Sequence, residues 1–237
     1  MNYIITVKKG MKIVLRIRFK KWARPELEAS EFYIDNPEDY KGKWNTLFAN
    51  KNNPIHLELG CGKGHFISKL AVQNPSINYI AIDLVDAMLG LAKRNVENTY
   101  ADAKKKVDNL LLTRFDIERI LLILNKQDNI KRIYINFCNP WPRGKHRKKR
   151  LTHTRQLEKY KEFLAPNSLI YFKTDDLDLF NSSLEYFSET GFTIIKQTNN
   201  LHSENNFWGD IPNIETEHEK MFLEQGIPIN ALIAKKG

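Results

Sequence analysis

The amino-acid sequence predicts an α/β fold: a doubly wound, mostly parallel β-sheet with an antiparallel last strand. From residue 55 onward, short β-branched apolar runs alternate with longer amphipathic segments, which is the pattern of a parallel sheet covered by helices on both faces. The last two apolar runs, 192–198 and 230–236, have no long helix between them. We therefore expect this pair to join the sheet antiparallel, and ligands to bind at the carboxyl ends of the parallel strands.

The individual elements follow from apolar periodicity. Short apolar runs predict parallel strands at 55–59, 77–82, 109–115, 132–137 and 168–174. The amphipathic segments after them predict helices to about residue 73, from 86 to about 100, through 123, over 154–164 and over 179–190. An Asn-rich segment, 198–213, lies between the last two strands. A loop of that length inside a domain is usually functional or disordered.

The chain is expected to form one domain over residues 55–237, preceded by a basic arm and extension over residues 1–54. The extension holds the basic sequence RIRFKKW at 16–22 and turn-forming residues at Pro37 and Gly42. We expect it to be partly mobile. Its first ten residues carry no motif, and a start at residue 11 is an alternative.

Composition narrows the choice of partner. Lys and Arg outnumber Asp and Glu by 37 to 28, for a formal charge of +9, and the excess gathers in two places, which favours a polyanionic partner. Cys61 and Cys138 lie far apart in apolar runs, as in a reduced protein of the cytoplasm. No stretch approaches the roughly 20 apolar residues of a membrane span, and no His or Cys stands at metal-ligand spacing. We expect no membrane, no metal and no obligatory protein partner.

A glycine-rich loop follows the first parallel strand. It reads ELGCGKG over residues 58–64, and Gly60, Gly62 and Gly64 allow a tight turn and the close approach of a ligand to the backbone. A dinucleotide fingerprint has the spacing G-x-G-x-x-G and holds a pyrophosphate. The G-x-G-x-G spacing, with Glu58 two residues ahead of it, indicates instead a zwitterionic ligand with a sulfonium group, which a nearby carboxylate favours.

Two further acids end strands at the same edge of the predicted sheet. Asp83 ends the second strand, where an acid accepts hydrogen bonds from the ribose hydroxyls of a bound nucleoside. Asp116 ends the third strand, where a carboxylate can accept the amino group of adenine. Capping of the next helix is the alternative role of Asp116, and both roles are compatible.

The segment after the fourth strand combines a rigid turn with positive charge. A Pro-Trp-Pro sequence follows Asn139, and two prolines around a tryptophan hold the chain extended. Seven of the eight residues 143–150 are basic, counting His146. Because this run begins at the ligand-binding edge of the sheet, it indicates contact with RNA rather than a solvated helix face.

These motifs give the chain a specific resemblance to the bacterial single-subunit tRNA (guanine-N7-)-methyltransferases, which belong to the class I superfamily that has a Rossmann-like sheet and uses S-adenosylmethionine (SAM). The similarity covers nearly the whole chain after residue 11: the basic arm, the glycine loop, the Pro-Trp-Pro and basic segment, the KTD sequence at 173–175 and the TEHE sequence at 216–219. It implies transfer of a methyl group from SAM to N7 of the guanine at position 46, in the tRNA variable loop.

The resemblance also implies roles for residues of this chain. For the cofactor it points to Glu58, Asp83, Asp116 and the residue before Pro140, which is aspartate in the family and Asn139 here. Asn139 is also the catalytic candidate, and its amide keeps one carbonyl acceptor. The implied substrate contacts are Arg143 (usually lysine in the family), Asp175, Thr216, Glu217, His218 and Glu219. The implied RNA contacts are Lys145, His146, Arg147, Lys148, Lys149 and Arg150.

The chemistry of guanine makes the change at Asn139 tolerable. N7 already carries an in-plane lone pair, so alignment with the methyl group matters more than a strong base. The donors on the guanine N1 and N2 suit acceptors such as Asp175 and Glu219, with Thr216 adding a hydroxyl. An RNA-binding module with little turnover is the alternative that Asn139 suggests, although such a module has no use for the glycine loop. A methyltransferase for a small molecule or protein would leave the basic segment unused.

Overall fold

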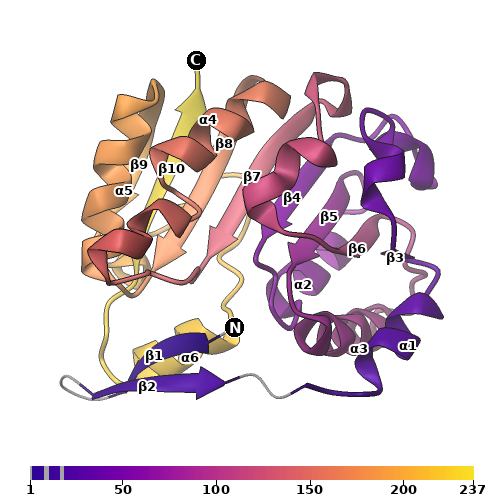
Figure 1. Cartoon of the computed structure of the whole chain (residues 1–237), viewed down its shortest axis with the longest axis horizontal. Helices are drawn as coiled ribbons and strands as arrows, with labels where there is room; N and C mark the ends of the chain where they lie inside the picture. The colour runs from indigo at the N-terminus through magenta and orange to yellow at the C-terminus, as the bar shows by residue number, and fades with distance from the viewer. Residues whose placement is uncertain (1, 8–10, 17–18) are drawn as a thin grey trace.

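The structure, a computed structural model, describes residues 2–7, 11–16 and 19–237, with side chains from residue 19 onward. Within these residues, one sheet has eight strands in the order β3-β6-β5-β4-β7-β8-β10-β9. A separate antiparallel pair joins β1 (Asn2–Val7) to β2 (Met11–Arg16), in the segment that the sequence predicts to be a partly mobile arm. Figure 1 shows the main sheet crossing the molecule between its helices.

The direction of the strands agrees with the fold class predicted from the sequence. All neighbouring strands run parallel except β10, which is antiparallel to both β8 and β9. The last strand therefore lies between its two predecessors in the chain, because the long connection after β9 allows the chain to return into the sheet. The main-sheet strands are β3 (Tyr33–Ile34), β4 (Ile55–Leu59), β5 (Asn78–Asp83), β6 (Leu110–Arg114), β7 (Ile130–Asn136), β8 (Leu164–Thr174), β9 (Phe192–Thr198) and β10 (Asn230–Lys236).

The helices form two layers, one on each face of the sheet. From β4 the chain moves outward through β5 and β6, and then crosses back to β7 and β8 on the other side of β4. Right-handed crossovers therefore place α2 and α3 on one face and α4 and α5 on the other, and the contacts of α1 and α2 with α3, and of α4 with α5, agree. The helices are α1 (Ala23–Glu28), α2 (His65–Gln73), α3 (Asp86–Asp102), α4 (Thr154–Phe163), α5 (Leu177–Glu189) and α6 (Glu217–Glu224).

One predicted helix has a different form. The segment expected to be helical through residue 123 is a 3-10 helix over Ile117–Leu122, with a non-helical backbone at Arg119. Among the described helices, none is long and apolar enough to cross a membrane.

The residues before β4 pack against the domain. β3 pairs with β6 and extends the sheet by one short strand. Trp44 is fully buried and its indole Nε1 donates to the carbonyl of Ile123, 2.8 Å away. Asp128 accepts hydrogen bonds from the backbone N–H groups of Gly42 and Trp44 at 3.0 and 3.3 Å. These contacts join residues 41–48 to the end of the sheet opposite the glycine loop.

Candidate cofactor and RNA site

The glycine loop forms one wall of a cavity of about 230 Å³ at the carboxyl end of β4. Gly60, Gly62 and Gly64 all have positive φ angles, of 79°, 54° and 73°, which only glycine adopts without strain. A Cβ on Gly64 would lie 2.9 Å from the Cβ of Ala92, so this glycine lets α2 approach α3. The cavity is lined by Glu58, Gly60, Cys61, Gly62, Lys63, Gly64, His65, Phe66, Met88, Asn136, Phe137, Thr216, Glu217 and His218.

Glu58 is the acid at the floor of this cavity. Its side chain is buried, with 2% of the residue exposed, and its Oε1 accepts a hydrogen bond from the Asn136 amide at 2.9 Å. Its Oε2 has no hydrogen-bond partner among the described residues. Burial raises the pKa of Glu58 to about 8, although the Asn136 hydrogen bond and the charge of Lys173 oppose the rise. The site thus holds a buried carboxyl group with one oxygen that has no hydrogen-bond partner among the described residues.

Asp83 and Asp116 do not line the cavity. The Asp83 carboxylate is buried and accepts from the backbone N–H groups of Gly62 and Val85, at 2.9 and 3.0 Å. It therefore holds the glycine loop against the end of β5. Asp116 accepts from the backbone N–H of Glu118 at 2.9 Å, which is the capping role weighed against adenine recognition.

The first turn of α6 closes the opposite side of the cavity. The Thr216 hydroxyl accepts from the backbone N–H of Glu219 at 3.0 Å, as a helix N-cap. Glu217 forms an ion pair with Lys63 of the glycine loop at 2.7 Å, and the His218 ring stacks on Phe137 with centroids 6.2 Å apart. Thr216, Glu217 and His218 thus lie against the same cavity as Glu58.

Glu219, expected to contact guanine, lies elsewhere. Its side chain is fully buried and both its oxygens are engaged within the protein. The Oε2 atom lies 2.6 Å from the Lys173 ammonium, and the Oε1 atom lies 2.9 Å from both the Asn213 amide and the His202 imidazole. The substrate role expected for Glu219 does not fit this arrangement, because no oxygen is left to accept from a guanine.

Lys173 has a structural role beside the cavity that the sequence analysis did not assign to it, although it quoted the residue in the KTD motif. Its side chain is 1% exposed, and it also donates to the backbone carbonyl of Ile214 at 3.0 Å. A lysine inside the apolar run SLIYFKT was the available signal, since a charge on a buried strand needs a partner. The partner comes from α6 and from the 198–213 segment, so Lys173 holds both against the sheet.

The loop after β7 carries Asn139 beside the sheet edge. The Asn139 Oδ1 accepts from the backbone N–H of Trp141 at 3.1 Å, and Trp141 has a φ of 43°. The Trp141 ring meets His146 edge-on and lies 5.3 Å from the Lys149 ammonium. Asn139 is half-buried and does not line the glycine-loop cavity.

Two predicted substrate residues flank this loop. Arg143 is exposed at the start of the basic segment, and Asp175 is half-buried immediately after β8. Burial raises the pKa of Asp175 to about 6, so its carboxyl group is mostly ionised at neutral pH.

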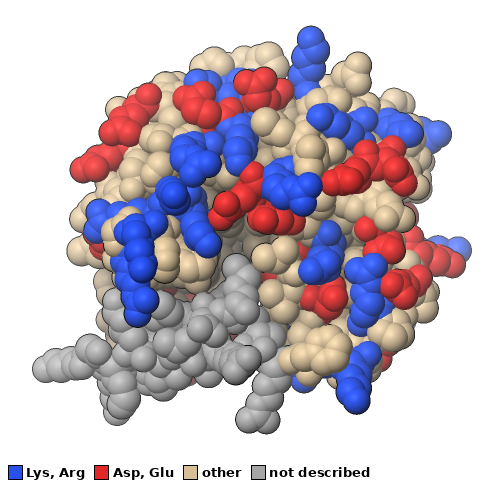
Figure 2. Space-filling view, in the orientation of Figure 1, with Lys and Arg blue, Asp and Glu red and all other residues tan. Residues whose placement is uncertain are grey.

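The basic segment forms a 3-10 helix over Gly144–Lys149. Figure 2 shows Lys and Arg side chains gathered where Figure 1 places this segment, in front of the strand ends. Lys145, Arg147, Lys148 and Lys149 are exposed, and His146 is half-buried. Arg150 differs from the five residues before it, because its side chain is fully buried. A direct RNA contact does not fit this burial.

Metal binding finds no support among the described residues, which contain no group of three or more His, Cys, Asp or Glu able to hold an ion. Both cysteines are free.

Comparison with known proteins agrees with this geometry. A family model described as "Putative methyltransferase" matches residues 52–232. The tRNA (guanine-N(7)-)-methyltransferase of Clostridium beijerinckii is 56% identical over 223 residues, covering 94% of this chain and 99% of that protein. The protein of the same name from Acetivibrio thermocellus is 52% identical over 222 residues, covering 94% of this chain and all of that protein.

Among solved structures, the fold is shared with a 16S rRNA methyltransferase, KamB, with a TM-score of 0.56, 17% identity and 99% coverage of both chains. The eight-stranded sheet of the described residues and the glycine-loop cavity define a class I methyltransferase. Within that class, the sequence matches show that the chain belongs to the tRNA (guanine-N(7)-)-methyltransferase family.

Proposed function

We propose that this protein transfers a methyl group from SAM to N7 of a guanine in tRNA, at position 46 in the variable loop, and that it does so in the cytoplasm. The observation that carries the proposal is the joint placement of two features at one sheet edge: a glycine-loop cavity with a buried, half-satisfied Glu58, and an exposed basic segment. The names of the close relatives support the same reaction.

The residues of the cavity fit SAM. The Oε2 atom of Glu58 is buried without a hydrogen-bond partner among the described residues, and a ligand with ammonium and sulfonium groups would satisfy it. At Gly60 and Gly62 an added Cβ would meet at most one side-chain atom within 4 Å, so the backbone is open to a ligand there. SAM, when bound, supplies the electrophilic methyl group.

The remaining site residues do not need to supply a strong base for methyl transfer. Guanine N7 has a free lone pair, so the chain must mainly hold the base in line with the methyl group. Asp175, ionised at neutral pH, can accept from the N1–H and N2 donors of guanine, and the Asn139 amide lies on the neighbouring loop. The exposed lysines of the basic segment would bind phosphates and orient the tRNA.

The contribution of Glu58 to cofactor affinity should increase with pH. Because the pKa of Glu58 is about 8 in the free protein, most molecules hold this carboxyl protonated at pH 7, and a cationic ligand selects the ionised form. Between pH 7 and pH 9 we expect the ratio of the Kd of Glu58→Gln to the Kd of wild type for SAM to rise by about tenfold, as the competent fraction of the wild type rises. Calorimetry of SAM binding to wild type and to Glu58→Gln would measure this.

The amino group of SAM titrates equally with both proteins, so the difference between them isolates Glu58. Equal pH profiles for wild type and Glu58→Gln would show that Glu58 does not take part in binding.

The function itself is tested by tritium transfer from labelled SAM to an unmodified tRNA transcript, followed by mapping of the labelled nucleotide. We expect label on the variable-loop guanine, and none on a matched transcript with 7-deazaguanine at that position, which lacks N7.

Asn139→Asp should change the single-turnover rate by less than about tenfold, because alignment rather than base strength limits the step.

A wild type with no detectable transfer, rescued by Asn139→Asp, would contradict this and favour an RNA-binding module with little turnover. Label at a nucleotide outside the variable loop would contradict the proposed position.

A further inference from the structure

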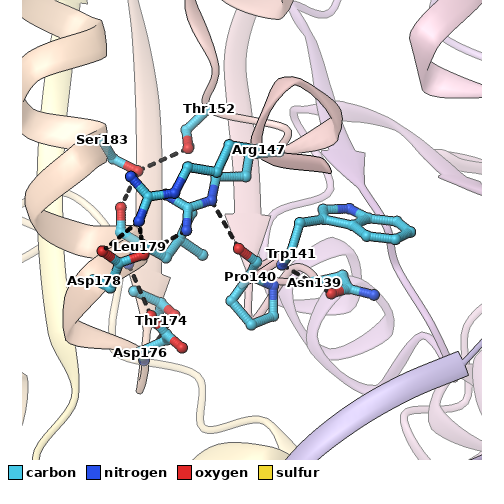
Figure 3. Close-up of polar contacts among 11 residues, drawn as sticks. Asn139, Pro140, Trp141, Arg147, Thr152, Thr174, Asp176, Asp178, Leu179 and Ser183 are labelled. Atoms are coloured by element: carbon cyan, nitrogen blue, oxygen red, sulfur yellow. Dashed lines mark hydrogen bonds and ion pairs between the residues drawn. The ribbon is translucent and has the colours of Figure 1, made fainter. Parts of the chain in front are cut away.

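The buried guanidinium of Arg150 joins two parts of the chain at the edge of the site. Its Nε donates to the backbone carbonyl of Pro140, 2.7 Å away, and its Nη2 lies 2.5 Å from the Asp178 carboxylate. Pro140 belongs to the loop after β7, and Asp178 belongs to the first turn of α5. Figure 3 labels the two ends of this connection, Pro140 beside Asn139 and Trp141, and Asp178 beside Asp176 and Leu179.

Both ends of this connection are themselves held in place. The Asp176 side chain caps α5 by accepting from the backbone N–H of Leu179 at 2.8 Å, which fixes the turn that carries Asp178. The hydroxyls of Thr152 and Ser183 meet at 2.7 Å in a buried contact and join the segment after Arg150 to the same helix. The planar guanidinium can therefore fix the position of the loop relative to α5, because α5 and the residues just after Arg150 are themselves held in place.

Pro140, the residue that Arg150 holds in the loop, is next to the catalytic candidate Asn139. Pro140 follows Asn139 directly, and the Asn139 Oδ1 accepts from Trp141, whose φ is 43°. A non-glycine residue rarely adopts this backbone conformation, and it persists only where its surroundings hold it. The bond from Arg150 to the Pro140 carbonyl lies inside this turn and connects it, through Asp178, to α5.

Arg147 shares the same carboxylate from the outside. Its Nη2 lies 3.2 Å from Asp178 Oδ1, and its side chain is 45% exposed whereas that of Arg150 is 0% exposed. The two arginines of the basic segment thus have different surroundings: Arg147 faces solvent, and Arg150 faces the loop.

We propose that Arg150 and Asp178 are positioning residues that set the Pro140 turn, and through it the orientation of Asn139, for methyl transfer. This proposal rests on the proposed function. Lysine at position 150 would keep the charge, but its single ammonium cannot reproduce the two directed bonds of the guanidinium fork. The turn should then lose its hold while the charge available to RNA stays the same.

The test compares Arg150→Lys and Asp178→Asn with Arg155→Lys, the same change at an exposed arginine of α4. At saturating tRNA and SAM, we expect the single-turnover rate of both test variants to fall by about tenfold or more. The Kd for SAM should change by less than about twofold in both, and so should the Kd for tRNA of Arg150→Lys, whose charge is unchanged. The double variant should be no slower than the slower single variant, because the two residues act as one unit. The control should match wild type.

Hydrogen exchange provides a readout that does not depend on activity. Amides of residues 137–150 should exchange faster in both test variants than in wild type, with the exchange of β4 unchanged. Unchanged exchange in this segment, or an unchanged rate at saturation, would overturn the proposal. Loss of SAM affinity, rate and melting temperature together would also overturn it, since that is the result of a merely structural role.

The result that would refute the proposed function differs from the results that would refute the positioning role of Arg150. A wild type that methylates no tRNA would refute the function, and hydrogen exchange alone would then decide whether Arg150 holds the turn.

Discussion

Replacing Glu219 with glutamine is expected to destabilise the protein by about 3 to 5 kcal/mol, because it removes one partner of a buried ion pair. Lys173 and Glu219 approach to 2.6 Å with side-chain exposures of 1% and 0%. Glutamine keeps the size of the side chain but leaves the Lys173 ammonium buried without a counter-charge. Urea unfolding monitored by circular dichroism would measure the change in the free energy of unfolding.

The pH dependence of the same variant has a defined sign. Burial lowers the pKa of Lys173, and the Glu219 carboxylate opposes this in the wild type. Without the carboxylate the folded pKa should fall further below the unfolded value, so the unfolded state binds more protons. Stability then rises with pH, and the deficit of Glu219→Gln should be smaller at pH 9 than at pH 7.

Glu217→Gln is the matched control, with the same chemical change two residues earlier in the same helix. Its ion pair with Lys63 is exposed on both sides, so its loss should cost less than about 1 kcal/mol. If Glu219→Gln costs no more than Glu217→Gln, the carboxylate is not engaged with Lys173 in solution. Glu219 would then be available to substrate, as the family resemblance implies.

The case of Glu219 shows what the sequence could and could not predict about the site. The T-x-x-E pattern at 216–219 is a capping-box signature, and the structure contains that box. The resemblance to the family assigns the same residues to guanine contacts instead. What decides between the two is Lys173, which lies on β8 and meets Glu219 only after α6 docks against the sheet.

Arg150 is a second residue whose surroundings could not be predicted from the sequence. In the sequence it is one more basic residue in a run that predicts exposed RNA contacts. Its burial depends on a carboxylate 28 residues later, Asp178, and local pattern contains no information about such a pair. The alternating strands and helices from residue 55, in contrast, follow from local periodicity and were predictable. The two-residue β3 has no periodicity to detect, so only the sheet it joins makes it a strand.

The basic segment should account for much of the tRNA affinity. Changing Lys145, Lys148 and Lys149 to alanine is expected to weaken tRNA binding by about a hundredfold near physiological salt, because each bound phosphate releases condensed counterions. The slope of log K against log salt concentration should become shallower by about 0.7 to 0.9 units for each phosphate that the variant no longer binds. Fluorescence anisotropy of labelled tRNA at several salt concentrations would measure both quantities.

A control with the same reduction in charge separates local binding from net charge. Lys105, Lys106 and Lys131 are exposed and lie near the starts of β6 and β7, at the opposite edge of the sheet from the basic segment. Their replacement by alanine also removes three charges, so the long-range field changes equally in both variants, whereas only the first variant binds fewer phosphates. We expect the control to keep the wild-type salt slope. Equal slopes for the two triple variants would mean that tRNA is attracted by the charge of the whole protein and does not bind at the basic segment. The phosphate contacts proposed for that segment would then be wrong.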